Sequence, residues 1–313
     1  MAHGKATRDH RQGEAPRGSR LELLETAGFG DYALLDSGSG RKLERFGPVV
    51  VDRPEPQALW QPRHDKRSWD KANAVFSGAD DEDKGRWRID RPVPESWPVK
   101  VLDATVLCRL SSFRHMGLFP EQLPHWEWML ARLAEVEDGP PRVLNLFAYT
   151  GAASLIAAAA GAQVTHVDAS KKAIAWAKEN QAASELGSAP IRWILDDAQK
   201  FVAREVRRGK TYHVILVDPP KFGRGPDGEV WDLFTHLPPL LNGCAELLDA
   251  KRAALVLTIY AIRASSLAFD QLTREVLEKR GGTFASGELA IREADSGRLL
   301  PASLFTRWVS HGA

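Results

Sequence analysis

Apolar residues from residue 142 onward fall in short runs that alternate with segments of helical spacing. The runs predict strands and the segments between them predict helices: strands over 142–147, 163–167, 191–195, 212–217 and 253–258, and helices over 151–160, 171–184, 198–208, 232–248 and 264–280. Two further strands, near 283–291 and 303–309, are joined only by a turn around 295–297 and therefore form an antiparallel hairpin. This alternation indicates an α/β fold with a doubly wound, mostly parallel sheet of seven strands.

The first hundred residues have a different pattern. Apolar runs at 32–35, 43–46 and 49–51, with a turn over 36–40, predict a small antiparallel β unit. Residues 52–98 show little periodicity. Because the composition shifts after Val99, we expect a flexible, weakly basic tail over 1–20, a β-rich domain over 21–100 and a larger domain over 101–313.

Four tryptophans in the N-terminal region are interleaved with basic side chains. They are Trp60, Trp69, Trp87 and Trp97, among Arg63, Lys66, Arg67, Arg86, Arg88 and Arg91. Such rings either stack on unpaired RNA bases or form the core of a small β domain beneath arginine side chains. Seven acidic residues in the same stretch dilute the positive potential and favour the core, with contact to nucleic acid as the alternative.

Charge and cysteine content narrow the class of protein. A formal net charge of +1 over 313 residues gives no overall electrostatic reason to bind nucleic acid or a membrane, so a basic surface must be local. No segment approaches the roughly 18 apolar residues of a membrane span, and the first twenty residues lack the apolar core of a secretory signal. Two cysteines, Cys108 and Cys244, are too few for a structural zinc site and indicate a reducing compartment. We therefore expect a cytoplasmic protein without a metal.

Polar residues follow three of the predicted parallel strands. The turn after the first strand, from Asn145 to Gly151, has one glycine and offers no pyrophosphate cradle, and no Walker loop follows it. Asp168, seventeen residues past Gly151, closes the second strand at a spacing that suits ribose hydroxyls. Asp196 and Asp197 follow the third strand, where a carboxylate can accept from an adenine amino group; a helix N-cap is the alternative for Asp196 and for Asp168. A nucleoside without phosphates, S-adenosylmethionine, fits this set.

With these motifs, the chain resembles the class I S-adenosylmethionine-dependent methyltransferases, and within them the bacterial large-subunit rRNA methyltransferases related to the cytosine-C5 type. The similarity covers about 110–310 and lies in residues 145–154, 167–170 with Asn180, 196–198, 218–222 and, more weakly, 117–122. It implies that Asn145, Tyr149 and Gly151 shape the methionine and ribose side of the cofactor site. Asp168 would then hold the ribose, Asp197 with the Ala198 backbone would read adenine, and Phe119 and Gln122 would close over the cofactor. The implied cofactor site also includes Phe147, Ala148, Thr150, Ala169, Ser170 and Asp196.

A rigid corner follows the fourth parallel strand. It reads Asp218, Pro219, Pro220, Lys221 and Phe222, and reaction chemistry gathers at such strand ends in open α/β sheets. Asp218 and the carbonyl groups of the proline pair are expected to accept from a base amine. Lys221 is expected to polarise an oxygen or contact a phosphate, and Phe222 to stack on a flipped base. The alternatives are a solvated loop lysine for Lys221 and a lid over the core for Phe222.

The resemblance breaks at one residue. Cytosine-C5 enzymes add a cysteine thiolate to the base, and in the similar enzymes this thiol follows the fifth strand. Here that position carries Tyr260 and Arg263, and Cys244 is expected inside the preceding helix. Tyr260 is expected to contact the acceptor, and Arg263 and Arg224 to contact phosphate, with a core tyrosine and a surface arginine as the alternative for the pair at 260 and 263.

The sequence thus predicts a methyltransferase that acts on a base nitrogen in RNA, with rRNA favoured. A second interpretation keeps the enzyme class but replaces RNA by a protein side chain or a small molecule, in line with the near-neutral charge. A third is a cofactor- or RNA-binding module without turnover.

Overall fold

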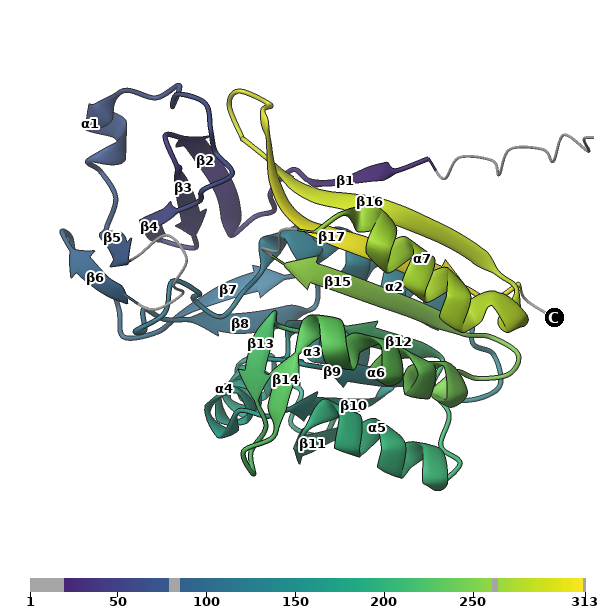
Figure 1. Cartoon of the computed structure of the whole chain (residues 1–313). Coiled ribbons are helices and arrows are strands. Elements are labelled where there is room, and N and C mark those ends of the chain that lie inside the picture. The colour runs from purple at the N-terminus through teal and green to yellow at the C-terminus, as the bar shows by residue number, and fades with distance from the viewer. Residues whose placement is uncertain (1–19, 79–84, 261–263, 312–313) are drawn as a thin grey trace, which may run out of the picture.

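The computed structural model describes residues 20–78, 85–260 and 264–311. A large twisted sheet carries helices on both faces, and a smaller β unit lies beside one end of it (Figure 1). The large sheet has eight strands in the order β1 (Glu22–Thr26), β16 (Thr283–Arg292), β17 (Leu299–Val309), β15 (Ala254–Tyr260), β12 (Val214–Val217), β9 (Arg142–Leu146), β10 (Gln163–Asp168) and β11 (Ile191–Leu195).

The predicted α/β class and its seven strands are confirmed. Every neighbouring pair in the large sheet is parallel except those of β17, which runs antiparallel to both β15 and β16. The predicted hairpin of the last two strands is therefore present. The eighth strand, β1, was expected in the N-terminal domain but pairs with β16 at the edge of the large sheet.

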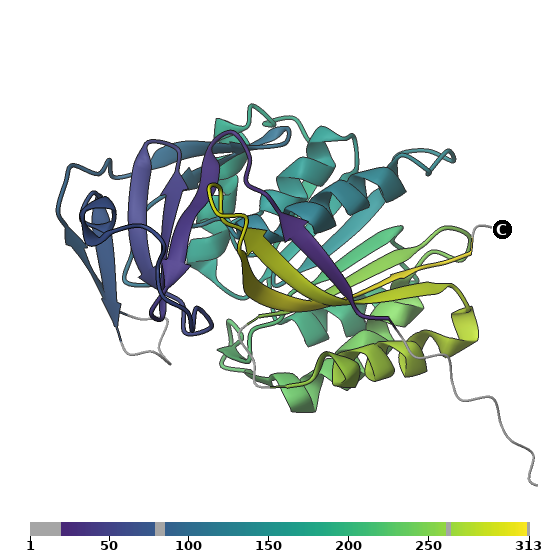
Figure 2. The ribbon, with the colours of Figure 1, turned by 90° about the horizontal axis from the view of Figure 1, so that it is seen from above.

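Helices cover both faces of the large sheet (Figure 2). One face carries α2 (Leu123–Leu133), α3 (Ala152–Ala159) and α4 (Lys171–Ala183), and the other carries α5 (Ala198–Arg207), α6 (Leu233–Leu247) and α7 (Ser266–Leu277). Two short 3₁₀ turns, η1 (Pro120–Gln122) and η2 (Glu278–Arg280), flank α2 and α7. Successive residues of β9 serve opposite cores, because Val143 packs with α2 and α3 while Leu144 packs with α5 and α6.

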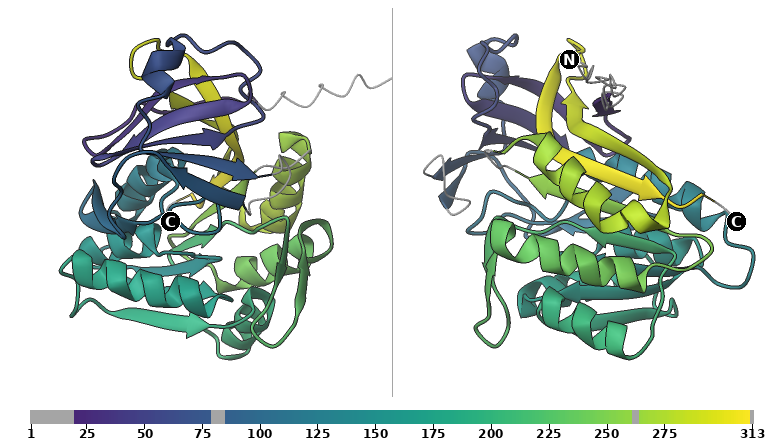
Figure 3. Two further views of the ribbon diagram at one scale, coloured as in Figure 1. Left: turned by 90° about the vertical axis from the view of Figure 1, so that its left-hand side faces the viewer. Right: turned by 45° about the vertical axis from the view of Figure 1, so that its right-hand side comes forward.

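The smaller unit is a five-stranded sheet in the order β2 (Tyr32–Gly38), β3 (Arg41–Phe46), β4 (Val49–Pro54), β5 (Ala74–Gly78) and β6 (Gly85–Ile89). Its strands are antiparallel except for the short parallel pairing of β4 with β5. A helical turn, α1 (Lys66–Trp69), precedes β5, and the hairpin of β7 (Trp97–Val101) and β8 (Ala104–Cys108) leads back toward the large sheet (Figure 3).

Of the four N-terminal tryptophans, Trp97 is buried and the other three are half-buried. Trp97 is 2% exposed and donates its indole N–H to the Phe46 carbonyl. The other three indoles also donate within the chain: Trp60 to the Ser37 carbonyl, Trp69 to the Asp36 carboxylate and Trp87 to the Phe113 carbonyl. These bonds support the core interpretation over base stacking. The tail, residues 1–19, lies outside the described residues.

The two units share one hydrophobic core. Tyr32, Leu34 and Val51 of the small unit belong to the same buried cluster as Met129 and Leu155 of the large one. The carboxyl end of β15 points toward the small unit (Figure 1), so the edge where ligands bind in open α/β sheets faces this junction.

Candidate active site

The loop after β9 has a strained backbone. Phe147 and Tyr149 adopt positive φ angles of 55° and 48°, which non-glycine residues rarely do, and Gly151 follows at 85°. The ring of Phe147 turns away to pack on Trp231, with ring centroids 4.8 Å apart. The Ala148 amide donates to the Val167 carbonyl. Only the backbone of Phe147 therefore lies at the edge of the sheet, because its ring packs in the core. Strained backbone of this kind is common at ligand sites.

Asp168 fixes this loop at the end of β10. Its carboxylate accepts from the Tyr149 amide and from the Ser170 amide, each at 2.8 Å. Burial raises its pKa, and the two amide bonds act in the opposite direction. A carboxylate has about four lone-pair positions, so Asp168 keeps acceptor capacity for ribose hydroxyls. Ser170 itself caps α4, accepting from the Ala173 amide, and Ala169 lies half-buried between the two.

Two predicted cofactor residues have their side chains engaged inside the fold. Asn145 donates to the Ser154 hydroxyl at 3.0 Å, which in turn contacts His166 at 3.0 Å. Thr150 is buried and donates to the Gly117 carbonyl, while its own carbonyl accepts from the Asn180 side chain. These bonds tie the strained loop to α3, to α4 and to the segment before α2.

The acids after β11 divide their roles. Asp197 caps α5 by accepting from the Lys200 amide at 3.0 Å, so the capping role considered for Asp196 falls to its neighbour. Asp196 accepts from the Arg204 guanidinium at 2.5 Å. Ala198 opens α5 and is buried. Adenine recognition by Asp197 and the Ala198 backbone stays a prediction.

Asp218, at the end of β12, is held by a side chain of η1, the turn that precedes α2. The Gln122 amide donates to its carboxylate at 3.0 Å, and the Thr258 hydroxyl contacts the Gln122 carbonyl oxygen at 3.4 Å. Burial, and secondarily the nearby Glu121 carboxylate, raises the pKa of Asp218 to about 7. Gln122, expected over the cofactor, thus orients the acid of the reaction corner. Sequence motifs gave no signal for this contact, because 96 residues separate the pair.

The proline pair is only partly available for a substrate. Pro219 is buried, and the Pro220 carbonyl accepts from the Trp231 indole at 2.7 Å. The Pro220 carbonyl therefore has one of its two lone pairs engaged, and acceptance from a base amine by the two proline carbonyl groups stays a prediction. The Lys221 carbonyl is also used, accepting from the Leu233 amide.

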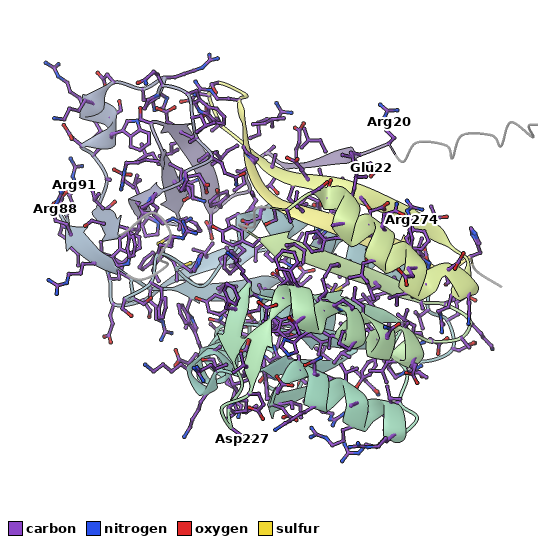
Figure 4. All side chains as sticks on the ribbon, in the orientation of Figure 1. Arg20, Glu22, Arg88, Arg91, Asp227 and Arg274 are labelled. Carbon is purple, nitrogen blue, oxygen red and sulfur yellow. The ribbon has the colours of Figure 1, made fainter. Side chains whose placement is uncertain are left out.

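Lys221, Phe222 and Arg224, which were expected to contact RNA, lie at a short hairpin that the sequence motifs did not predict. β13 (Phe222–Arg224) pairs with β14 (Val230–Asp232), and Asp227 lies at the outer tip (Figure 4). The Phe222 ring is 62% exposed, which excludes the alternative of a lid over the core. The Lys221 ammonium lies 5.2 Å from the centre of that ring, and Arg224 is exposed.

A wall of aromatic rings joins the cofactor loop to Tyr260. Phe119 lies 5.7 Å from Tyr149 and 6.1 Å from Tyr260, measured between ring centroids. His115 contacts both Phe119 and Tyr260, and the Arg114 guanidinium donates to the Tyr260 hydroxyl at 3.2 Å. Tyr260 is thus at the site as expected, whereas Arg114 and His115 were missed because they belong to no motif. Arg263 lies outside the described residues.

Neither cysteine is placed for nucleophilic catalysis. Cys244 is fully buried inside α6 and Cys108 inside β8. Burial raises the pKa of both thiols to about 12, so at neutral pH they are not thiolates. Within the described ranges, no group of three or more His, Cys, Asp or Glu side chains is arranged to hold a metal ion. None of the helices described has both the length and the apolar character to cross a membrane.

The sheet has this strand order, with acids at successive strand ends. A strained loop without a phosphate cradle and a proline corner lie at the same edge. Together these features are typical of an S-adenosylmethionine-dependent methyltransferase. A family model described as "Conserved hypothetical protein 95" matches residues 130–227. A solved structure of a SAM-dependent methyltransferase from Agrobacterium tumefaciens is 53% identical, covers 94% of this chain and 97% of that one, and superposes with a TM-score of 0.88.

A more distant solved structure shares the fold, and a curated relative is similar over part of its sequence. A putative SAM-dependent methyltransferase from Streptococcus mutans is 17% identical over 89% of this chain and 75% of its own, with a TM-score of 0.68. The ribosomal RNA large subunit methyltransferase K/L of Shewanella frigidimarina (strain NCIMB 400) is 40% identical over 109 residues. That match covers 34% of this chain and 15% of the Shewanella protein, so the chain spans a small part of that curated relative.

The chain belongs to the class I S-adenosylmethionine-dependent methyltransferases, and it is a transferase with S-adenosylmethionine as its cofactor. The residues present fit that cofactor, because Asp168 keeps acceptor capacity for hydroxyl groups and holds the amide of Tyr149 in the strained loop beside it.

Proposed function

We propose that the enzyme transfers a methyl group from S-adenosylmethionine to a nitrogen of an RNA base, with ribosomal RNA as the substrate. The name of the Shewanella relative supports this substrate, although the match covers only part of that protein. A ribosomal RNA substrate would place the reaction in the cytoplasm, as the cysteine content leads us to expect.

The proposal rests on which reactive groups the site contains. A carboxylate that can accept a proton lies at the reaction corner, whereas both thiols of the chain are buried away from it. Asp218 lies at the reaction corner, oriented by Gln122, and burial raises the pKa of its carboxyl to about 7. Cys108 and Cys244 are both buried elsewhere. Carbon methylation of cytosine needs a thiolate, whereas a base nitrogen already has the electron pair that attacks. The site therefore favours a nitrogen acceptor.

When bound, S-adenosylmethionine would supply an electrophilic methyl group to the acceptor nitrogen, and its sulfur would be released as a neutral thioether as the carbon–sulfur bond breaks. The nitrogen then loses a proton, which the Asp218 carboxylate accepts and passes to solvent. Asp168 and the loop at 147–151 hold the donor, Phe222 stacks on the base, and Lys221 and Arg224 contact phosphate.

Transfer of labelled methyl to RNA tests the proposal directly. The purified enzyme is incubated with labelled S-adenosylmethionine and total rRNA from a strain that lacks the gene, and the labelled nucleoside is identified by mass spectrometry. We expect a methyl group on a base nitrogen. Label on cytosine C5, or no label in RNA, would contradict the proposal. An Asp168→Ala variant, impaired in cofactor binding, serves as the inactive control.

The near-neutral charge favours a second candidate, a protein side chain or a small molecule as acceptor. Comparing the modified rRNA nucleosides of the deletion strain with those of its parent separates the two. A modification lost from rRNA supports the RNA substrate, and an unchanged set supports the alternative.

A further inference from the structure

The hairpin of β13 and β14 leaves two apolar side chains in water beside the reaction corner. Phe222 is 62% exposed and Val230 is 61% exposed, and β13 begins directly after Lys221 of that corner. We propose that the outer face of this hairpin binds the nucleotide next to the target base, so that the enzyme takes an unpaired stretch of RNA. This role rests on the proposed RNA substrate and adds to it the form of that RNA and a second nucleotide contact.

Strand pairing gives the hairpin an inner and an outer face. Trp231, on the inner face, is buried against the ring of Phe147 in the cofactor loop. Arg224 pairs with Val230 across the hairpin, so both lie on the outer face, together with Phe222 two residues before Arg224. The outer face is thus held in a fixed position relative to the loop that binds the donor.

The turn of the hairpin is closed by its own hydrogen bonds. The Gly225 amide donates to the Glu229 carbonyl at 2.8 Å, and the Glu229 carboxylate accepts from the Asp227 amide at 3.0 Å. The same carboxylate pairs with the Lys200 ammonium of α5. A hairpin that is already ordered loses little conformational freedom on binding, so less of the binding free energy is lost to ordering it.

The charge beside the exposed apolar side chains is positive. Lys221 and Arg224 are both exposed. Among the acids of the hairpin, Glu229 is neutralised in its ion pair, Asp232 is half-buried and caps α6, and Asp227 lies away at the outer tip (Figure 4). Bases pack on apolar side chains and phosphates pair with cations, so this combination suits a nucleotide chain.

The spacing of the two apolar side chains indicates unstacked bases. Phe222 and Val230 are diagonal neighbours across the strand pair, a relation that places them about 7–8 Å apart. Successive bases of a stacked strand are about 3.4 Å apart. Two successive bases that contact Phe222 and Val230 must therefore be splayed apart, as in a single-stranded loop and unlike a duplex.

A charge placed on the outer face tests this role. Val230→Glu puts a carboxylate where the RNA would pass, and the fold should tolerate it because the side chain is exposed. The matched control is Thr283→Glu, which alters a β-branched, exposed residue at the amino end of β16, opposite the reaction corner. We measure melting temperature, cofactor affinity by calorimetry, and steady-state transfer to total rRNA from the deletion strain. Val230→Glu should raise KM for RNA at least tenfold with cofactor affinity unchanged, and the control should change neither.

A competition experiment keeps the inference testable if Val230→Glu does not fold. Oligouridine should inhibit wild-type transfer to rRNA at a concentration at least tenfold lower than its duplex with oligoadenine. An unchanged KM in a folded Val230→Glu variant, or equal inhibition by the strand and the duplex, overturns the inference while wild-type transfer to RNA leaves the proposed function intact. A wild-type enzyme that transfers nothing to RNA overturns the proposed function itself.

Discussion

Asp218 lies in an environment that stabilises its protonated form. Burial and the neighbouring Glu121 raise its pKa to about 7, whereas an aspartate in an unfolded chain titrates near 4. Between about pH 4 and 7 the folded protein therefore binds a proton that the unfolded chain has released. The folded state then loses stability as pH rises through this window. An ionised Asp218 thus lowers the free energy of unfolding, although the reaction needs this form of the side chain.

Replacing this acid should separate stability from activity. At pH 8 we expect Asp218→Asn to raise the free energy of unfolding by about 1–3 kcal/mol, allowing for the partial exposure of the group. The gain should vanish below about pH 4, where wild-type Asp218 is protonated in both states. In the wild type, kcat/KM should rise with pH through about 7, while the variant should be nearly inactive. Urea unfolding at pH 4 and pH 8 checks the first point, and a variant that loses stability at pH 8 would contradict it.

Asp168 allows a prediction on the cofactor side. Asp168→Ala removes the acceptor of two backbone amides and the expected ribose contact. We expect cofactor affinity to fall at least tenfold, because each hydrogen bond to a charged group contributes about 1.5–3 kcal/mol. Isothermal titration measures this, with the highly exposed Asp138→Ala as control. Wild-type affinity in Asp168→Ala would remove the residue from the cofactor site.

At the scale of elements, strands of the large sheet were predictable because they are buried on both faces. β12 is an uninterrupted apolar run, and β9 and β15 are mostly apolar. β5 and β6 were missed because their outer residues are polar or exposed, and β13 and β14 have three residues each. The positions of the acids at the strand ends could be predicted from the order of strands and helices in the sequence. The contacts of Gln122 and Arg114 could not, because only the tertiary fold brings these segments together.

The edge pairing of β1 depends on one glycine. A Cβ atom at Gly287 would lie 1.8 Å from the Glu22 carbonyl oxygen, so the two strands cannot pair there with any side chain at this position. We expect Gly287→Ala to detach β1 and lower the free energy of unfolding by about 1–3 kcal/mol. Hydrogen exchange should then show faster exchange in β1 and β16. Gly187→Ala, at a position with open space around it, is the control. Unchanged protection of β1 would show that the strands adjust.

At the scale of the whole molecule, the shared core bears on how the chain unfolds. Phe46 and Val49 of the small unit lie in the same buried cluster as Val143 and Val256 of the large sheet. A second brace joins the Ser37 hydroxyl to the Glu293 carboxylate, 256 residues further along the chain. The boundary proposed near residue 100 therefore divides the sequence without dividing the interior.

We accordingly expect one cooperative transition on heating. Scanning calorimetry of the full chain should give a calorimetric enthalpy equal to the van't Hoff enthalpy. A fragment of residues 101–313 should be unfolded or aggregated, because it exposes the shared core and lacks β1. The fragment 20–311 is the control and should melt like the full chain. Two separate transitions would contradict the prediction.

The path of the chain restricts how the small unit can move. The chain leaves the large sheet at the end of β1, builds the five-stranded unit, and returns through the hairpin of β7 and β8. The unit is thus an insertion joined to the sheet by two chain segments, and the shared core and the contact of Ser37 with Glu293 also hold it there. Moving the unit away from the edge of the sheet would expose the apolar side chains of that core to water. The small unit is therefore a fixed part of the sheet edge and not a hinged lid.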